Sequence, residues 1–124
     1  MNKVKVDKIE IEGITYVPES SMPQMAKIVD DMKYVMIRTY SAGVHCGYLK
    51  SRDGKECELI QSIRIWKWAG AASLSQLAME GTNDVNNCKF AMAVNSIILT
   101  EVIEIIEMTK TAKESIQNVA SWKN

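Results

Sequence analysis

The chain has 124 residues, 47% hydrophobic and 24% charged, which is typical of one folded domain whose core needs no disulfide or metal. Its 15 basic and 15 acidic residues give a formal net charge of zero, which argues against nucleic acid as a partner. No apolar run approaches the ~20 residues that a membrane span needs, so a membrane-spanning protein is excluded.

The first 33 residues are predicted to form an extension made of a hairpin and a helix. Isoleucines alternate with polar residues on both sides of Glu12-Gly13, a pattern typical of a short β-hairpin. A helix is then expected, with Ser21 as its cap and Pro23 in its first turn. Its apolar stripe consists of Met25, Ile28, Val29 and Met32. The stripe needs a partner surface, either the main body or another subunit.

Residues 34–124 are predicted to form a single β-rich domain. Runs of β-branched and aromatic residues between turn signals indicate strands at 34–40, 44–49, 56–60 and 63–68. Asp53-Gly54 is a strong signal for a hairpin turn.

The second half of the chain mixes strands with two short helices. "GAASLSQLAMEG" predicts a helix that ends at Gly81, and a last helix is expected at about 109–118, with Thr111 and Glu114 at capping-box spacing. Residues 88–94 and "SIILTEVIEII" each read as a strand. The predicted fold is α+β and β-rich: an antiparallel curled sheet or small barrel with short helices at its edges.

The histidine and the cysteines do not form a metal-binding pattern. His45, Cys46, Cys57 and Cys88 are suitable residue types, but there is no Cys-x-x-Cys pair and no second histidine. On a strand, His45 and Cys46 also point to opposite faces. We therefore predict neither metal nor cofactor. The odd number of cysteines without a preceding apolar signal segment predicts free thiols and a cytoplasmic protein.

Catalysis would have to use His45, the only histidine in the chain. Its partner would be Cys57 or a serine on a facing strand, or an acid such as Glu56 or Glu58. Nothing in the spacing requires such a pair, and a strand histidine with local hydrogen bonds accounts for the same pattern. We predict no catalytic residues.

Aromatic and basic residues alternate in two strand segments, which favours a binding site. In "SIRIWKW" alternation places Arg64, Trp66 and Trp68 on one face, and "YVMIRTY" places Arg38 and Tyr40 together. Aromatic rings can stack on a base and arginine can hold a phosphate. Residues 70–73 begin a helix whose amides could attract an anion. Alternatively, the tryptophans fill the core and the small residues let the helix pack closely.

Several stretches resemble a family of small uncharacterised proteins encoded by phages and prophages, which carry a domain of unknown function. They are "RTYSAGVHCGYLKSRDGKE", "RIWKWAGAASLSQLAMEG", "NCKF" and "ILTEVIEII", and the resemblance covers about residues 34–122. Ile63 stands where the family often has a second basic residue, and Ala91 and Glu107 stand where proline is common. The resemblance implies no activity and no catalytic residues.

A phage origin suggests a counter-defence protein in the bacterial host cytoplasm. We expect a non-enzymatic homo-oligomer that sequesters a nucleotide-like immune signal, such as a cyclic ADP-ribose isomer or a cyclic dinucleotide. The aromatic residues would stack on the base, the arginines would hold phosphates, and the ribose would contact His45 or Tyr48. The predicted ligand-binding residues are Arg38, Tyr40, His45, Tyr48, Arg64, Trp66, Trp68, Gly70, Ala71, Ala72 and Ser73.

Two other functions remain open. In the first, residues 1–33 contact a host protein, because methionine adapts to varied surfaces, and the aromatic faces are core or subunit interface. In the second, His45 and a nearby acid cleave a nucleotide.

Overall fold

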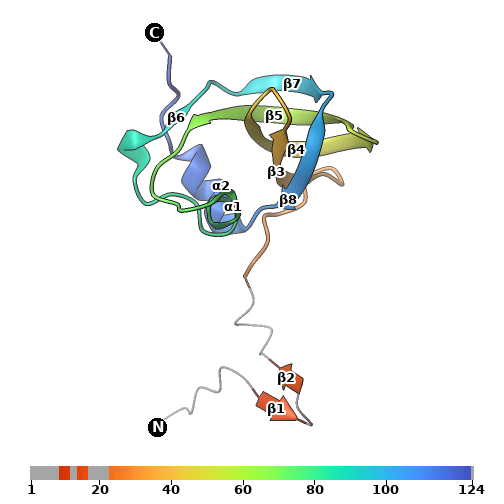
Figure 1. The fold of residues 1–124 in the computed structure, drawn as a ribbon, viewed down its shortest axis with the longest axis vertical. Helices are drawn as coiled ribbons and strands as arrows, with labels where there is room; N and C mark the ends of the chain where they lie inside the picture. The colour runs from red at the N-terminus through yellow and green to blue at the C-terminus, as the bar shows by residue number, and fades with distance from the viewer. Residues whose placement is uncertain (1–8, 12–13, 17–22, 124) are drawn as a thin grey trace.

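A computed structural model describes residues 9–11, 14–16 and 23–123 (Figure 1). At the N-terminus, β1 (Ile9–Ile11) and β2 (Ile14–Tyr16) pair in antiparallel fashion, which confirms the predicted hairpin strands. The proposed cap Ser21 and the turn at residues 12 and 13 lie outside the described residues.

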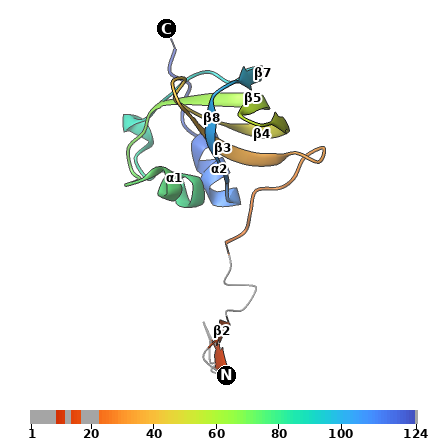
Figure 2. The same ribbon diagram turned by 45° about the vertical axis from the view of Figure 1, so that its right-hand side comes forward.

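The main body is an antiparallel six-stranded sheet that is curled but not closed, which confirms the predicted fold class. Its strands are β3 (Lys33–Thr39), β4 (Val44–Asp53), β5 (Glu56–Lys67), β6 (Lys89–Phe90), β7 (Val94–Leu99) and β8 (Val102–Glu107). They follow the order β6-β5-β4-β3-β8, and β7 pairs with β5. The helices α1 (Leu74–Glu80) and α2 (Lys110–Gln117) lie together on one side of the sheet (Figures 1 and 2).

Several strand boundaries differ from the prediction. The two segments predicted at 56–60 and 63–68 form the single strand β5. Of the strand predicted at 88–94, Lys89–Phe90 forms β6 and Val94 begins β7, and the residues between them are not in a strand. "SIILTEVIEII" spans two strands, because the chain turns at Thr100-Glu101. β7 then pairs with β5 while β8 pairs with β3, so the two strands lie at opposite edges of the sheet.

The predicted helix at residues 23–33 is wrong. Val29 and Met32 pair across a tight turn in which Asp30 and Asp31 have positive φ angles of 51° and 62°. Before the turn, the Ala26 N–H donates to the Met108 carbonyl at 3.0 Å, so the segment runs along the body. Hydrogen bonds to residues 108–110 satisfy backbone groups that would have been satisfied within the segment if it were a helix.

The predicted capping box of the last helix is also wrong, although the helix itself is confirmed. The cap is Thr109, whose hydroxyl accepts a hydrogen bond from the Ala112 N–H at 3.0 Å and donates to the Met79 carbonyl at 2.7 Å. Thr109 therefore joins the start of α2 to the end of α1.

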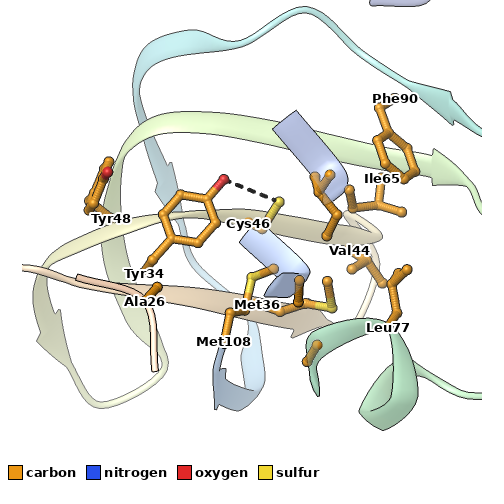
Figure 3. Close-up of a cluster of buried hydrophobic side chains, with 13 residues drawn as sticks. Ala26, Tyr34, Met36, Val44, Cys46, Tyr48, Ile65, Leu77, Phe90 and Met108 are labelled. Carbon is orange, nitrogen blue, oxygen red and sulfur yellow. Dashed lines mark hydrogen bonds between the residues drawn. The ribbon is translucent and has the colours of Figure 1, made fainter. Parts of the chain in front are cut away.

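The sheet has a core on each side. We call the side covered by α1 and α2 the helix face; Figure 3 shows part of its core, which includes Tyr34, Met36, Cys46, Ile65 and Phe90. On the other side, the concave face, the edge strands β7 and β8 meet β3 and β5 over a smaller core: Val35, Ile37, Cys57, Leu59, Leu99 and Val102. Register shifts between β3 and β8, and at two places between β4 and β5, increase the local twist and help the sheet to curl.

Candidate ligand-binding site

A bulge in β5 determines which side chains reach the concave face. Cys46 pairs with Ile63 and Tyr48 pairs with Ile60, so two β5 residues, Gln61 and Ser62, lie opposite the single residue Gly47. Gln61 has a positive φ of 52°. A Cβ atom on Gly47 would lie 2.9 Å from the Ile60 carbonyl oxygen, so the close approach requires glycine here.

Because of this bulge, Ser62 and Arg64 share the concave face with His45. Ile60 and Ile63 both pack on the helix-face core, although strict alternation would place them on opposite faces. His45 lies directly opposite Arg64 in the β4–β5 ladder, and directly opposite residues of an antiparallel pair project to the same side.

His45, Ser62 and Arg64 line a cleft of about 300 Å³ between the sheet and the chain that connects β6 to β7. The rest of its lining is apolar: Ala91, Met92, Val94 and Ile97. His45 is fully buried and Ser62 is 2% exposed, whereas Arg64 is exposed. The cleft therefore has two buried polar side chains at its base and a cation at its rim.

The imidazole of His45 has a defined tautomer. Its Nε2 lies 2.9 Å from the Ala42 carbonyl oxygen, and because a carbonyl can only accept, Nε2 carries the hydrogen. Burial lowers the pKa of His45 below its usual value. The hydrogen bond to Ala42 opposes this shift, and the positive charge of Arg64 adds to it. The ring is therefore neutral at pH 7, and Nδ1 offers a lone pair as an acceptor.

Two polar atoms of the cleft lack partners. His45 Nδ1 and Ser62 Oγ are buried and form no hydrogen bond with any described residue. Such groups are rare, because burying an unpaired donor or acceptor costs about 1–3 kcal/mol. Arg64 forms no ion pair within the described part of the chain, although three other cations do.

The structure does not bring the two predicted arginines together. Arg38 lies opposite Val44, a residue of the helix-face core, and its Nε is 3.1 Å from Glu104 Oε1. Arg64 projects from the concave face. The predicted neighbour of Arg38, Tyr40, is 81% exposed just beyond β3.

Tyr48 and Trp68 belong to the helix face rather than to the cleft. Tyr48 is buried, packs edge-on against Tyr34 with ring centroids 5.0 Å apart, and accepts a hydrogen bond from Lys113 Nζ. Trp68 packs on the helix-face core, whereas Trp66 is 64% exposed and stacks on Trp122. The predicted shared face of Arg64, Trp66 and Trp68 is therefore wrong, because a second bulge at Trp66 interrupts the alternation.

The segment Gly70–Ser73 does not line the cleft. Gly70 has a φ of 79° and packs against Thr82, Asn83 and Asp84. The Ala72 N–H donates to Gln76 Oε1 at 2.7 Å, and Ser73 Oγ accepts from the Gln76 N–H at 3.1 Å, so these groups cap α1. Ala71 packs on the helix-face core.

The groups considered for catalysis are separate from His45. Glu58 accepts a hydrogen bond from Ser96 Oγ at 2.7 Å, and Glu56 pairs with Asp53 at the opposite end of β5 from Arg64. Cys57 is buried in the concave-face core, and burial raises the pKa of its thiol. Within the described residues, neither carboxylate nor Cys57 forms a hydrogen bond with His45.

The cysteines are free thiols spread over the fold. Cys46 accepts a hydrogen bond from the Tyr34 hydroxyl at 3.8 Å (Figure 3), and burial raises the pKa of Cys46 to about 12. Among the described residues, no group of three His, Cys, Asp or Glu side chains could hold a metal ion. In the same part of the chain, no helix is long and apolar enough to cross a membrane.

Sequence reasoning missed Ser62 and the apolar lining of the cleft. Ser62 carries no motif, and its face depends on the bulge. The cleft is lined by Met92, Val94 and Ile97 because the chain after β6 returns along β5 as β7. Gly47 inside a strand was the one local signal, because a strand glycine often marks a bulge or a close backbone approach.

Comparison with known proteins gives one match. A family model, that of the domain of unknown function DUF6948, matches residues 32–116. This range includes every residue that lines the cleft and the strands that carry them. Neither a curated protein nor a solved structure matches the chain. The chain therefore belongs to the DUF6948 family.

Proposed function

We propose that this protein is a non-enzymatic binding protein that holds a nucleotide-like small molecule in the cleft of His45, Ser62 and Arg64. The observation that carries the proposal is a pair of buried polar atoms beside Arg64: the two atoms have no hydrogen-bond partner, and Arg64 no ion pair, among the residues that the structure describes. A bound ligand would supply the missing partners and offset the cost of burying these groups.

The chemistry of the lining is consistent with a phosphorylated, ring-containing ligand. Arg64 can hold a phosphate through two N–H groups, and the Ser62 hydroxyl can donate or accept. His45 Nδ1 accepts from an amino or hydroxyl group of the ligand, and Met92 and Ile97 pack against a flat ring. In the described part of the chain, no acid or nucleophile forms a hydrogen bond with His45, which favours binding over turnover.

The proposed biological setting is phage counter-defence, in which the protein withdraws a nucleotide signal from a host immune pathway. The resemblance to phage-encoded proteins supports this setting, and binding without cleavage is the behaviour it requires. A homo-oligomer would add further surface around the cleft.

The test is ligand recovery. The purified full-length protein is incubated with a panel of mononucleotides, dinucleotides and cyclic nucleotide signals, freed of unbound ligand and denatured; mass spectrometry then identifies the released molecule. We expect an intact nucleotide at about one per cleft. A cleaved product would contradict the non-enzymatic proposal, and an empty protein would contradict binding.

Two arginine variants connect the recovered ligand to the cleft. Arg64→Ala is expected to weaken binding at least about tenfold, as for a lost charge-assisted hydrogen bond. Arg38→Ala is the matched control, because Arg38 is also a strand arginine but lies on the other face beside Glu104. Equal loss in both variants would contradict the assignment of the cleft.

A further inference from the structure

A pair of exposed tryptophans lies at the end of β5 and is not part of the cleft. Trp66 and Trp122 are 64% and 52% exposed, and their rings stack with centroids 6.2 Å apart and planes inclined by 20°. Trp66 is the extra residue of the bulge between β5 and β6, and the Trp122 N–H donates to the Phe90 carbonyl at 2.8 Å. Backbone pairing therefore presents both indoles at the surface.

One lysine lies beside these rings and faces a second lysine across the β5–β6 ladder. Lys67 and Lys89 are directly opposite each other in the β5–β6 ladder, where like charges are destabilising. Lys89 Nζ lies 5.1 Å from the centre of the Trp122 ring. Neither lysine forms an ion pair with any carboxylate in the described residues. The surface is aromatic and locally basic, although the formal charge of the whole chain is zero.

This surface continues from the cleft. Lys89 and Phe90 are consecutive in β6, and Phe90 belongs to the helix-face core, so Lys89 and its partner Lys67 project from the other side of the sheet. Arg64, next to the core residue Ile65, projects from the same side. Arg64 and Lys67 are separated by roughly 10 Å along the strand.

We propose that Trp66, Lys67, Lys89 and Trp122 form a second nucleotide subsite, so that the ligand of this protein is a dinucleotide. The inference rests on the proposed function of the cleft. The cleft, at about 300 Å³, has room for one nucleotide-sized part, because ligand pockets span ~300–1,000 Å³. The second base stacks on the exposed face of Trp66, and the two lysines hold the adjoining phosphate.

Calorimetry with matched probes tests the second subsite. Affinities are measured at fixed salt for the 5′-mononucleotides of A, G, C and U and for the linear dinucleotides pApA, pGpG, pCpC and pUpU. At least one dinucleotide is expected to bind about tenfold or more tighter than its mononucleotide, since stacking on an aromatic side chain contributes at least that factor.

Variants show which residues cause the tighter binding of the dinucleotide. Trp66→Ala is expected to remove the dinucleotide advantage and leave mononucleotide affinity unchanged, Trp66→Phe to retain part of it, and Lys89→Ala to weaken only the dinucleotide. Lys55→Ala, an exposed lysine in the β4–β5 turn, is the control and should change neither affinity. Trp122→Ala removes the other ring of the tryptophan pair and provides a second, independent test of the subsite.

The outcomes separate the two proposals. A dinucleotide that binds no tighter than its mononucleotide, or a Trp66→Ala variant that weakens both equally, overturns the second subsite while the cleft stands. Affinity lost in Trp66→Ala but not in Arg64→Ala overturns the cleft and with it the two-part site. Binding of none of these probes overturns the second subsite, and it overturns the cleft as well when the recovery panel also yields no ligand.

Discussion

The two faces of the sheet differ in whether their buried polar groups have hydrogen-bond partners. On the helix face, each of the buried polar side chains Tyr34, Tyr48 and Thr109 has a hydrogen-bond partner. On the concave face, His45 Nδ1 and Ser62 Oγ have none among the described residues. The helix face thus satisfies these buried polar groups internally, whereas the described part of the concave face leaves two unpaired beside Arg64, where we propose that a ligand binds.

The largest expected effect comes from the helix-face core. Phe90→Ala removes a fully buried ring that packs with Ile65, and should lower the free energy of unfolding by about 3–5 kcal/mol. Urea denaturation measures the loss. A change below about 1 kcal/mol would mean that this face does not carry the main core.

Gly47→Ala should disrupt the bulge that shapes the concave face. The added Cβ would lie 2.9 Å from the Ile60 carbonyl oxygen, so we expect a loss of about 1–3 kcal/mol together with loss of ligand binding. Gly54→Ala is the control: it is strained by its φ of 61° but has nothing within 4 Å of the new Cβ, so it should cost about 1–2 kcal/mol and leave binding unchanged. Equal binding in both variants would contradict the role of the bulge.

A pair of hydroxyl deletions compares the two faces directly. Thr109→Ala removes a helix cap and a hydrogen bond to Met79, and should cost about 1–2 kcal/mol. Ser62→Ala removes a buried hydroxyl that has no described partner, so in the absence of ligand it should be neutral or stabilising by up to about 1 kcal/mol. Thermal unfolding of both variants decides the point, and a loss in Ser62→Ala as large as in Thr109→Ala would contradict the contrast.

The smallest expected effect is a pH dependence. The folded state holds the pKa of His45 below the ordinary value of 6.5, so below that pH the unfolded chain binds a proton that the folded protein does not. Stability should therefore fall as the pH drops from about 6.5 towards the lowered pKa, by at most about 1.4 kcal/mol per pH unit. His45→Gln should flatten this dependence, because His45 is the only histidine. An unchanged slope would show that carboxylates cause it.

Much of the fold was predictable because its signals are local. The β-branched runs of β3 and β4, the Asp53-Gly54 turn and the stop of α1 at Gly81 each depend on residues that are neighbours in the chain. The separation of His45 from Cys46 follows from strand alternation alone, and the structure has these residues on opposite faces.

Only the tertiary structure decided where the remaining residues lie. Residues 23–32 have helical spacing but run beside Met108, because pairing with a distant segment outweighs periodicity. Each bulge in β5 shifts the side chains beyond it to the other face, so Ser62 joins His45, and Trp66 separates from Trp68. The sequence by itself determined β3, β4 and the Asp53-Gly54 turn, because these depend on near neighbours. The cleft depends on register between strands, for which Gly47 is the one local signal in the sequence.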